Sequence, residues 1–232
     1  MVWRSRHKVV HFWITLIVTI MKFISKARSA RLWAASFLVA LSIFALSTIS
    51  SAVPISVGDQ YGGGIVFYIL QPGDSGYDAV TQHGLIAATE DINVKGCVGK
   101  PGMYFWGVGK KTTERKADSY VQIFTTSQAI GHGAENTKKI LAKCPAATHP
   151  TIAAAVASAY NGGGNNDWYL PSKDELNKLY LTKAVVGGFA EYDYWSSTEN
   201  SATTAWVQLF SNGYQFADNK MDADFVRPVR SF

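Results

Sequence analysis

The sequence predicts an α+β domain over residues 53–232, after an N-terminal targeting segment over residues 1–52. Three observations lead to this class. Two short apolar runs stand near the start of the domain, helical periodicity follows in the middle, and short apolar runs separated by turns stand at the end. Strands at both ends with two to three helices between them are typical of α+β domains with antiparallel sheets.

The first two strands are expected to form a hairpin. Ile65–Leu70 is a continuous run of β-branched and aromatic residues after a turn at Gly62–Gly64, and Gly84–Ala88 is a second apolar run. The intervening residues 71–78 have the composition of a loop. From Asp91 to Gly133 the pattern weakens, so we expect irregular structure there.

Two helices are expected next, at Asn136–Ala142 and Thr151–Tyr160. Pro145 and Pro150 lie between them, and each disfavours a continuous helix because proline lacks an N–H group and restricts the residue before it. The sequence therefore predicts two short helices in place of one long one.

A third helix is predicted from Lys173 to about Lys183. Ser172 has the position of an N-cap, and Glu175 follows three residues later, which makes a capping box. Pro171 holds the chain extended before the cap. The helix dipole favours the acids of the first turn, so the spacing predicts a structural role for Glu175 and not a catalytic one.

The C-terminal part is expected to form three strands, at Tyr194–Ser197, Ala205–Phe210 and Phe225–Val229. Ser211-Asn212-Gly213 has the composition of a hairpin turn. Because apolar residues flank them, three tryptophans are expected in the core: Trp168, Trp195 and Trp206.

The N-terminal segment has the pattern of a secretory signal peptide. Residues 1–52 carry seven Lys/Arg and no Asp/Glu, and the apolar run Leu32–Leu46 has 15 residues, fewer than the roughly 20 that span a bilayer. Small residues at Ser50-Ser51-Ala52 predict cleavage after Ala52, with Met21 as the true start of translation. A retained anchor or membrane hairpin is the alternative. We expect an extracytoplasmic protein, secreted, periplasmic or at the cell surface.

Positive charge in the domain gathers between residues 95 and 143, which carry nine Lys/Arg and three acids. The rest of the domain is acidic on balance. A solvated loop explains this basic block, and the functional alternative is a surface for sulfated or acidic polysaccharide, since an exported protein seldom meets nucleic acid. The candidate ligand-binding residues are Lys110, Lys111, Arg115, Lys116, Lys138 and Lys139, with Tyr104 and Trp106 for stacking.

The domain has two cysteines, Cys97 and Cys144. In an exported protein an even pair favours a disulfide, and two buried thiols are the alternative. The bridge would close a loop that nearly coincides with the basic block. A chain-entropy estimate gives such a loop about 4 kcal/mol of stabilisation.

The sequence favours no catalytic centre. The three histidines of the domain have no metal-ligand spacing, and Ser196 and Ser197 stand in a predicted strand without a paired base. Oxygen donors that could suit Ca²⁺ cluster at Asp218, Asn219, Asp222 and Asp224, but their spacing matches no EF-hand loop. A solvated β-hairpin explains these acids, and we expect no cofactor or bound metal.

Three phrases combine aromatic and polar residues at fixed places: DWYLPSKDELNKLY over 167–180, YWSSTE over 194–199 and FVRPVRSF over 225–232. With GGGIVFYI over 62–69 and HGLIAATEDI over 83–92, they resemble the DUF1566 family, also called the Lcl C-terminal domain family. The resemblance covers nearly all of the chain after residue 57.

The resemblance implies a C-type lectin-like fold, in which both termini meet in one sheet and two helices flank it. It also implies a non-enzymatic domain, because collagen-like adhesins of this family bind sulfated glycans with it. This sequence shows no Gly-X-Y stretch, so trimerisation is left open, although a homo-oligomer fits. The alternatives are an extracytoplasmic enzyme related to formylglycine-generating enzymes and a structural subunit of a surface assembly.

Processing gives the first testable prediction. Secreted material should begin at Val53, because the apolar run and the small residues at 50–52 specify a signal-peptidase site there. N-terminal sequencing of the exported protein measures this directly, and retention of residues 1–20 would contradict it.

Overall fold

Two sheets and the helices around them form the domain in the computed structural model, which describes residues 54–93, 102–107, 120–124 and 126–232. Every described residue belongs to one compact unit, Pro54–Phe232. None of the helices in these described ranges is long and apolar enough to cross a bilayer. The α+β class predicted from the sequence is confirmed.

The first sheet joins the two ends of the domain. The predicted hairpin is confirmed, since β2 (Gly64–Ile69) pairs antiparallel with β3 (Gly84–Ala87). The short β1 (Gln60–Tyr61) extends the sheet on one side, and the C-terminal β9 (Val229–Ser231) pairs with β3 on the other. The last strand of the chain therefore lies in the sheet that the first strands begin.

The second sheet has the strand order β4-β8-β5-β6-β7. Its pairs are antiparallel except for β5 and β8, which run parallel. Its members are β4 (Met103–Phe105), β5 (Asp193–Glu199), β6 (Thr204–Leu209), β7 (Gln215–Asn219) and β8 (Ala223–Phe225). The register of β5 against β6 is irregular between Trp195 and Glu199.

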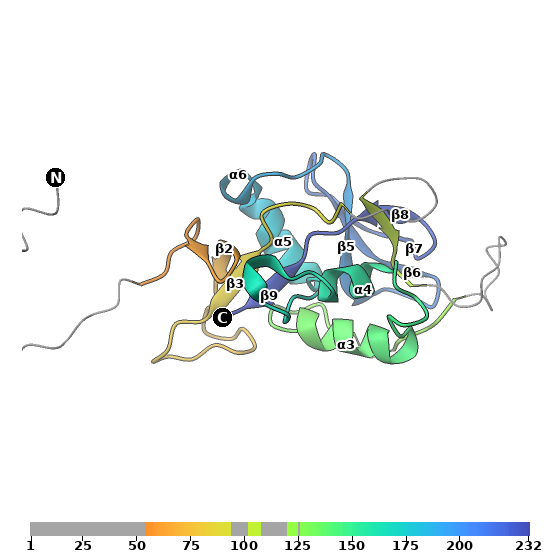
Figure 1. Ribbon diagram of the computed structural model, residues 1–232, viewed down its shortest axis with the longest axis horizontal. Coiled ribbons are helices and arrows are strands. Elements are labelled where there is room, and N and C mark those ends of the chain that lie inside the picture. The colour runs from red at the N-terminus through yellow and green to blue at the C-terminus, as the bar shows by residue number, and fades with distance from the viewer. Residues whose placement is uncertain (1–53, 94–101, 108–119, 125) are drawn as a thin grey trace, which may run out of the picture. The chain divides into compact units, whose positions relative to one another are not determined.

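The helices pack between and beside the sheets (Figure 1). Residues of α5 (Lys173–Leu181) contact β2 of the first sheet and β5 and β6 of the second, so this helix links the two. On another side, α3 (Gly133–Lys143) packs on β5 and on α4 (Ala153–Ser158). A short α6 (Lys183–Val186) follows α5.

The start of α5 confirms the predicted capping box. The Ser172 hydroxyl accepts a hydrogen bond from the backbone N–H of Glu175, and the Glu175 carboxylate accepts one from the backbone N–H of Ser172 at 2.7 Å. These two bonds satisfy backbone N–H groups at the start of the helix that have no partner within it.

Two glycine turns meet backbone to backbone. A Cβ on Gly63, whose φ is +88°, would lie 2.5 Å from the carbonyl oxygen of Gly162, and a Cβ on Gly163 would lie 2.3 Å from the Cα of Gly63. Only glycine fits both positions, because a side chain would clash and the positive φ would strain it. This contact fastens the hairpin of the first sheet to the short 3-10 turn Gly162–Gly164 before the Asp167 phrase.

Two predictions about strands were wrong. The segment Phe225–Val229 is not one strand, because β8 ends at Phe225 and β9 begins at Val229, so the chain passes from one sheet to the other. Pro228 cannot donate to a ladder, and the buried Arg227 donates to Asp91 and to the carbonyl of Ala88 at the crossing. The segment predicted as irregular also contains a strand, β4.

The tryptophans divide between core and surface. Trp168 and Trp195 are buried as predicted, at 2% and 0% exposure. Trp206 is only half-buried, so its placement in the core was wrong. The ammonium group of Lys173 lies over the Trp206 ring, 3.5 Å from the ring centroid, which is a cation–π contact.

The burial of Trp195 predicts a large loss of stability for Trp195→Ala. The side chain is fully buried, and its indole N–H donates to the carbonyl of Tyr104 at 2.7 Å. Deleting a buried aromatic side chain of this kind costs about 3–5 kcal/mol. Urea unfolding measures the change, with Tyr214→Ala as the control because Tyr214 is exposed. Equal destabilisation by both substitutions would contradict the prediction.

Candidate functional site

The basic side chains of the block that the structure describes are all on α3. Its inner face is buried through Gly133, Asn136, Thr137 and Ile140, at helical spacing. Lys138 and Lys143 are exposed on the outer face. Lys139 is half-buried and lies 3.9 Å from the carboxylate of Glu135, one turn earlier. This helix therefore presents positive charge to solvent while its other side packs in the core.

The remaining basic candidates, Lys110, Lys111, Arg115 and Lys116, lie outside the described residues. Their part in binding stays a prediction.

The two aromatic candidates of the basic block were wrong as stacking residues. Tyr104 and Trp106 are both 0% exposed and belong to the largest core cluster. The indole N–H of Trp106 donates to the carbonyl of Ser196 at 2.7 Å. β4 pairs with β8 at the edge of the second sheet, and both rings pack there into the core cluster that also contains Ile140 of α3 and Trp195 of β5.

Cys144 is buried, at 1% exposure, directly after the last residue of α3. Cys97 lies outside the described residues, so the disulfide between Cys97 and Cys144 stays a prediction.

An irregular segment, which we call the strap, leads into the start of α3. It comprises residues 120–124 and 126–132 of the described chain. The strap has no regular ladder, so side chains of other elements satisfy its backbone groups. At the end of β5, the Glu199 carboxylate accepts hydrogen bonds from the backbone N–H groups of Ile123 and Phe124, each at 2.8 Å. The Thr198 hydroxyl donates to the carbonyl of Ser127.

The first turn of α5 holds the other end of the strap. The Glu175 carboxylate accepts a hydrogen bond from the backbone N–H of Gly131 at 2.8 Å, and the Ser172 hydroxyl donates to the carbonyl of Ala129. Glu175 is fully buried, and this burial raises its pKa to about 7 although backbone N–H groups act in the opposite direction. The capping residues of α5 therefore also position the strap.

A buried ion pair fixes the first end of the strap, near Val121 and Phe124. The side chain of Lys220 is fully buried, and its ammonium group contacts the Glu199 carboxylate. It also donates to the carbonyls of Val121 and Ala202, at 3.1 and 2.9 Å, and lies 4.6 Å from the centroid of the Trp106 ring. All three donors of the ammonium group are thus used inside the domain. Burial lowers the pKa of Lys220, and the Glu199 carboxylate acts against that shift.

The side chains considered for nucleophilic chemistry are inside the domain. Ser196 and Ser197 are both 0% exposed, and their hydroxyls donate to the backbone carbonyls of Trp206 and Pro171. A buried hydroxyl that donates to a backbone carbonyl has neither access to a substrate nor a base to accept its proton. The YWSSTE phrase is therefore part of the scaffold.

The acidic cluster at residues 218–224 uses its groups within the protein. The side-chain oxygen of Asn219 accepts hydrogen bonds from the Tyr120 hydroxyl and from the backbone N–H of Met221, both at 3.0 Å. Asp218 and Asp222 are half-buried. Within the described ranges, no group of three or more His, Cys, Asp or Glu side chains is placed to hold a metal ion.

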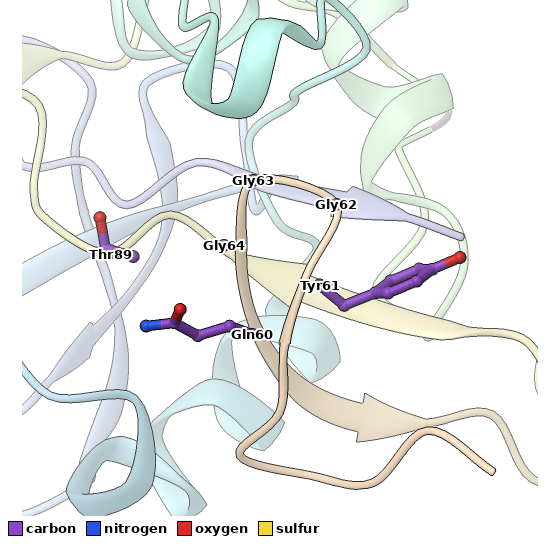
Figure 2. Close-up of a pocket in the computed structure, with 6 residues that line it drawn as sticks. All are labelled: Gln60, Tyr61, Gly62, Gly63, Gly64 and Thr89. Atoms are coloured by element: carbon purple, nitrogen blue, oxygen red, sulfur yellow. The ribbon is translucent and has the colours of Figure 1, made fainter. Parts of the chain in front are cut away.

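A shallow cavity of about 300 Å³ lies at the β1–β2 hairpin, lined by Gln60, Tyr61, Gly62–Gly64 and Thr89. Figure 2 shows the side chains of Gln60 and Thr89 on one side of the hairpin, whereas the ring of Tyr61 points to the other side. The lining thus offers mostly glycine backbone, one amide and one hydroxyl. This cavity has no base, nucleophile or charged group.

The three phrases at residues 167–180, 194–199 and 225–232 each contribute buried or capping residues to the scaffold of the domain. The model of the Lcl C-terminal domain family matches residues 105–230, more than half of the chain. The chain belongs to the Lcl C-terminal domain family. The matched region contains the strap and α3. It also contains the second sheet, except for the first two residues of β4.

Comparison with curated proteins gives no match. Among solved structures, the crystal structure of a fimbrial protein from Bacteroides ovatus ATCC 8483 is similar, with 17% sequence identity and a TM-score of 0.42. The similarity covers 78% of this chain and 45% of that chain, so the Lcl C-terminal domain described here spans less than half of the fimbrial protein. A TM-score at this level does not establish a common fold.

Sequence reasoning missed three residues that define this region: Phe124, Glu199 and Lys220. Glu199 stands in a recognised phrase, but the sequence does not show that its carboxylate reaches the strap. Lys220 is the one base among the acids of residues 218–224, which was a signal that it neutralises a buried acid. Nothing in the sequence around Phe124 distinguishes it from a core residue.

The buried carboxylate of Glu175 predicts a pH-dependent stability. Its pKa in the folded protein, about 7, is above its ordinary value of 4.5, so folding favours the protonated form. The stability from this group is therefore complete below about pH 4.5 and is lost as the pH rises through about 7. Glu175→Gln should remove this component of the pH profile, although it also lowers stability because an amide cannot accept all the same bonds.

Urea unfolding at several pH values between about 5 and about 8 measures the effect. Asp174→Asn is the matched control, because Asp174 is an exposed acid in the same turn of α5. An unchanged pH slope in Glu175→Gln would contradict the prediction.

Proposed function

We propose that this domain is an exported, non-enzymatic binding module of the cell surface that recognises sulfated or otherwise acidic polysaccharide through the basic block. Membership of the Lcl C-terminal domain family supports a binding role, since adhesins that resemble this family use the domain in that way. The surface location and the ligand class are our proposals for this chain.

The observation that carries the proposal is the orientation of α3. Gly133, Asn136, Thr137 and Ile140 are buried against the rest of the domain, whereas Lys138 and Lys143 are exposed to solvent and Lys139 is half-exposed. Three lysines within six residues of one helix create a local positive potential that attracts polyanions. The four basic candidates at residues 110–116 belong to the same basic block of the sequence, and their part in binding is a prediction.

Burial of the reactive side chains supports a module without catalysis. Ser196, Ser197 and Cys144 are inside the domain, and the described cavity at the hairpin has no acid, base or nucleophile. An enzyme related to formylglycine-generating enzymes would need an accessible reactive cysteine pair, which a buried Cys144 does not favour. A structural subunit without a small ligand is the remaining alternative.

We also propose that the fold is C-type lectin-like. The pairing of C-terminal β9 with N-terminal β3 in one sheet supports this, as do the helices beside that sheet. In such an arrangement the termini lie together, and the irregular segments between the elements remain available for binding.

The binding test uses heparin as a sulfated polysaccharide. Replacing Lys138, Lys139 and Lys143 together with Ser should weaken binding about tenfold, because three exposed charge contacts of roughly 0.5 kcal/mol each sum to this factor. Binding should also weaken as salt rises, since exposed charges are screened within about 8 Å at 0.15 M. Calorimetric titration at several salt concentrations measures both effects.

The triple Lys→Arg variant at the same positions is the control, because it keeps the charge and should keep the affinity. The combined Ser variant of Lys110, Lys111, Arg115 and Lys116 tests the rest of the block. Binding that needs calcium and ignores salt would instead indicate the acids of residues 218–224. Absence of heparin binding together with a stable oligomer would favour the structural-subunit alternative.

A further inference from the structure

Phe124 combines two features that are unfavourable in the isolated domain. Its φ is 56°, and it is the one non-glycine residue of the described chain with a positive φ. Its side chain is 59% exposed to solvent. A left-handed backbone conformation costs free energy for a bulky side chain, and only a minor part of the residue's surface is buried to offset this cost.

The surrounding structure enforces this conformation. The Glu199 carboxylate accepts hydrogen bonds from the N–H groups of both Ile123 and Phe124, and the buried Lys220 holds that carboxylate in place. Lys220 also binds the carbonyl of Val121, so the chain is fixed just before Phe124. Ile123 points into the core, at 5% exposure. The ring of Phe124 is therefore held outside by a rigid, buried ion pair.

The strap that carries Phe124 packs against α3, the helix that carries the candidate lysines. Ile123, the neighbour of Phe124, belongs to the same core cluster as Ile140 of α3. The strap is also bonded to α3 directly, because the side chain of Asn136 bonds both the N–H and the carbonyl of Ser127. Among the described Phe, Tyr and Trp residues from 102 to 143, Phe124 is the most exposed, since Tyr104 and Trp106 are buried and Phe105 and Tyr120 are half-buried.

We propose that Phe124 is a ligand-contacting residue that stacks on the apolar face of a pyranose ring in the bound polysaccharide. This inference rests on the proposed function and assigns its apolar contact. The C–H groups on one face of a sugar ring can pack against a phenyl ring, while the sulfate or carboxylate groups at the ring edge reach lysine ammonium groups. The two kinds of contact differ physically, since burial of apolar surface depends little on salt and charge contacts depend strongly on it.

The test compares three variants of the protein, each titrated with a size-defined heparin oligosaccharide at low and high salt. Phe124→Ala should weaken binding roughly tenfold by the same factor at both salt concentrations, because it removes apolar contact area and no charge. Phe124→Tyr should bind like the parent, since it keeps the ring. Lys138→Ser should weaken binding mainly at low salt.

Thermal unfolding separates a contact residue from a packing residue. Phe124→Gly should leave the melting temperature unchanged or raise it, because glycine adopts a positive φ without strain and the ring is mostly exposed. A fall in melting temperature as large as that of Trp195→Ala would overturn the proposal and make Phe124 a packing residue.

The two proposals fail in different ways. If the parent protein binds heparin and Phe124→Ala binds equally well, the stacking role is wrong while the basic surface stands. If the parent does not bind heparin at all, the proposed function fails and the stacking role fails with it. A loss in Phe124→Ala that disappears at high salt would also overturn stacking, because it would indicate an effect on the charged contacts.

Discussion

The fold around α3 depends on buried side chains that serve as hydrogen-bond partners for a segment without regular structure. Backbone N–H and C=O groups need partners wherever they leave water, and the strap has no ladder to supply them. Glu199 at the end of β5 and Glu175 at the start of α5 supply acceptors at its two ends, and the hydroxyls of Ser172 and Thr198 supply donors between them. Without these side chains, the strap would have no fixed path between the sheet and the helix.

The free-energy cost of burying a carboxylate is offset in different ways at Glu199 and Glu175. Glu199 faces Lys220, so the charges of the pair compensate each other, and the remaining donors of the ammonium group reach backbone carbonyls. Glu175, within the described chain, accepts bonds from backbone N–H groups and forms no ion pair, so burial raises its pKa toward neutrality. One end of the strap is therefore held by an ion pair, and the other by a carboxyl group that can become protonated near neutral pH.

The polar side chains of the family phrases are mostly used within the domain and are therefore not candidates for ligand contacts. Ser196, Ser197 and Glu199 use their polar atoms inside the domain, and so do Ser172 and Glu175. The candidate ligand-contacting side chains lie on segments that the phrases support, such as Lys138 on α3 and Phe124 on the strap. The scaffold and the candidate surface are thus made by different residues of the same region.

The sequence by itself determined the features that depend on near neighbours. The capping box needs only Ser172 and Glu175 three residues apart, and the hairpin of β2 and β3 needs only two apolar runs joined by a loop, so both were predicted. Tertiary structure decided the rest. Tyr104 and Trp106 are buried because they pack against distant segments, such as Trp195 of β5, and the buried Lys220 is paired with Glu199 of β5. Exposure of Phe124 likewise follows from a bond to Glu199, 75 residues away. Local spacing encodes a cap or a turn, whereas the burial of a side chain depends on which distant segments pack against it.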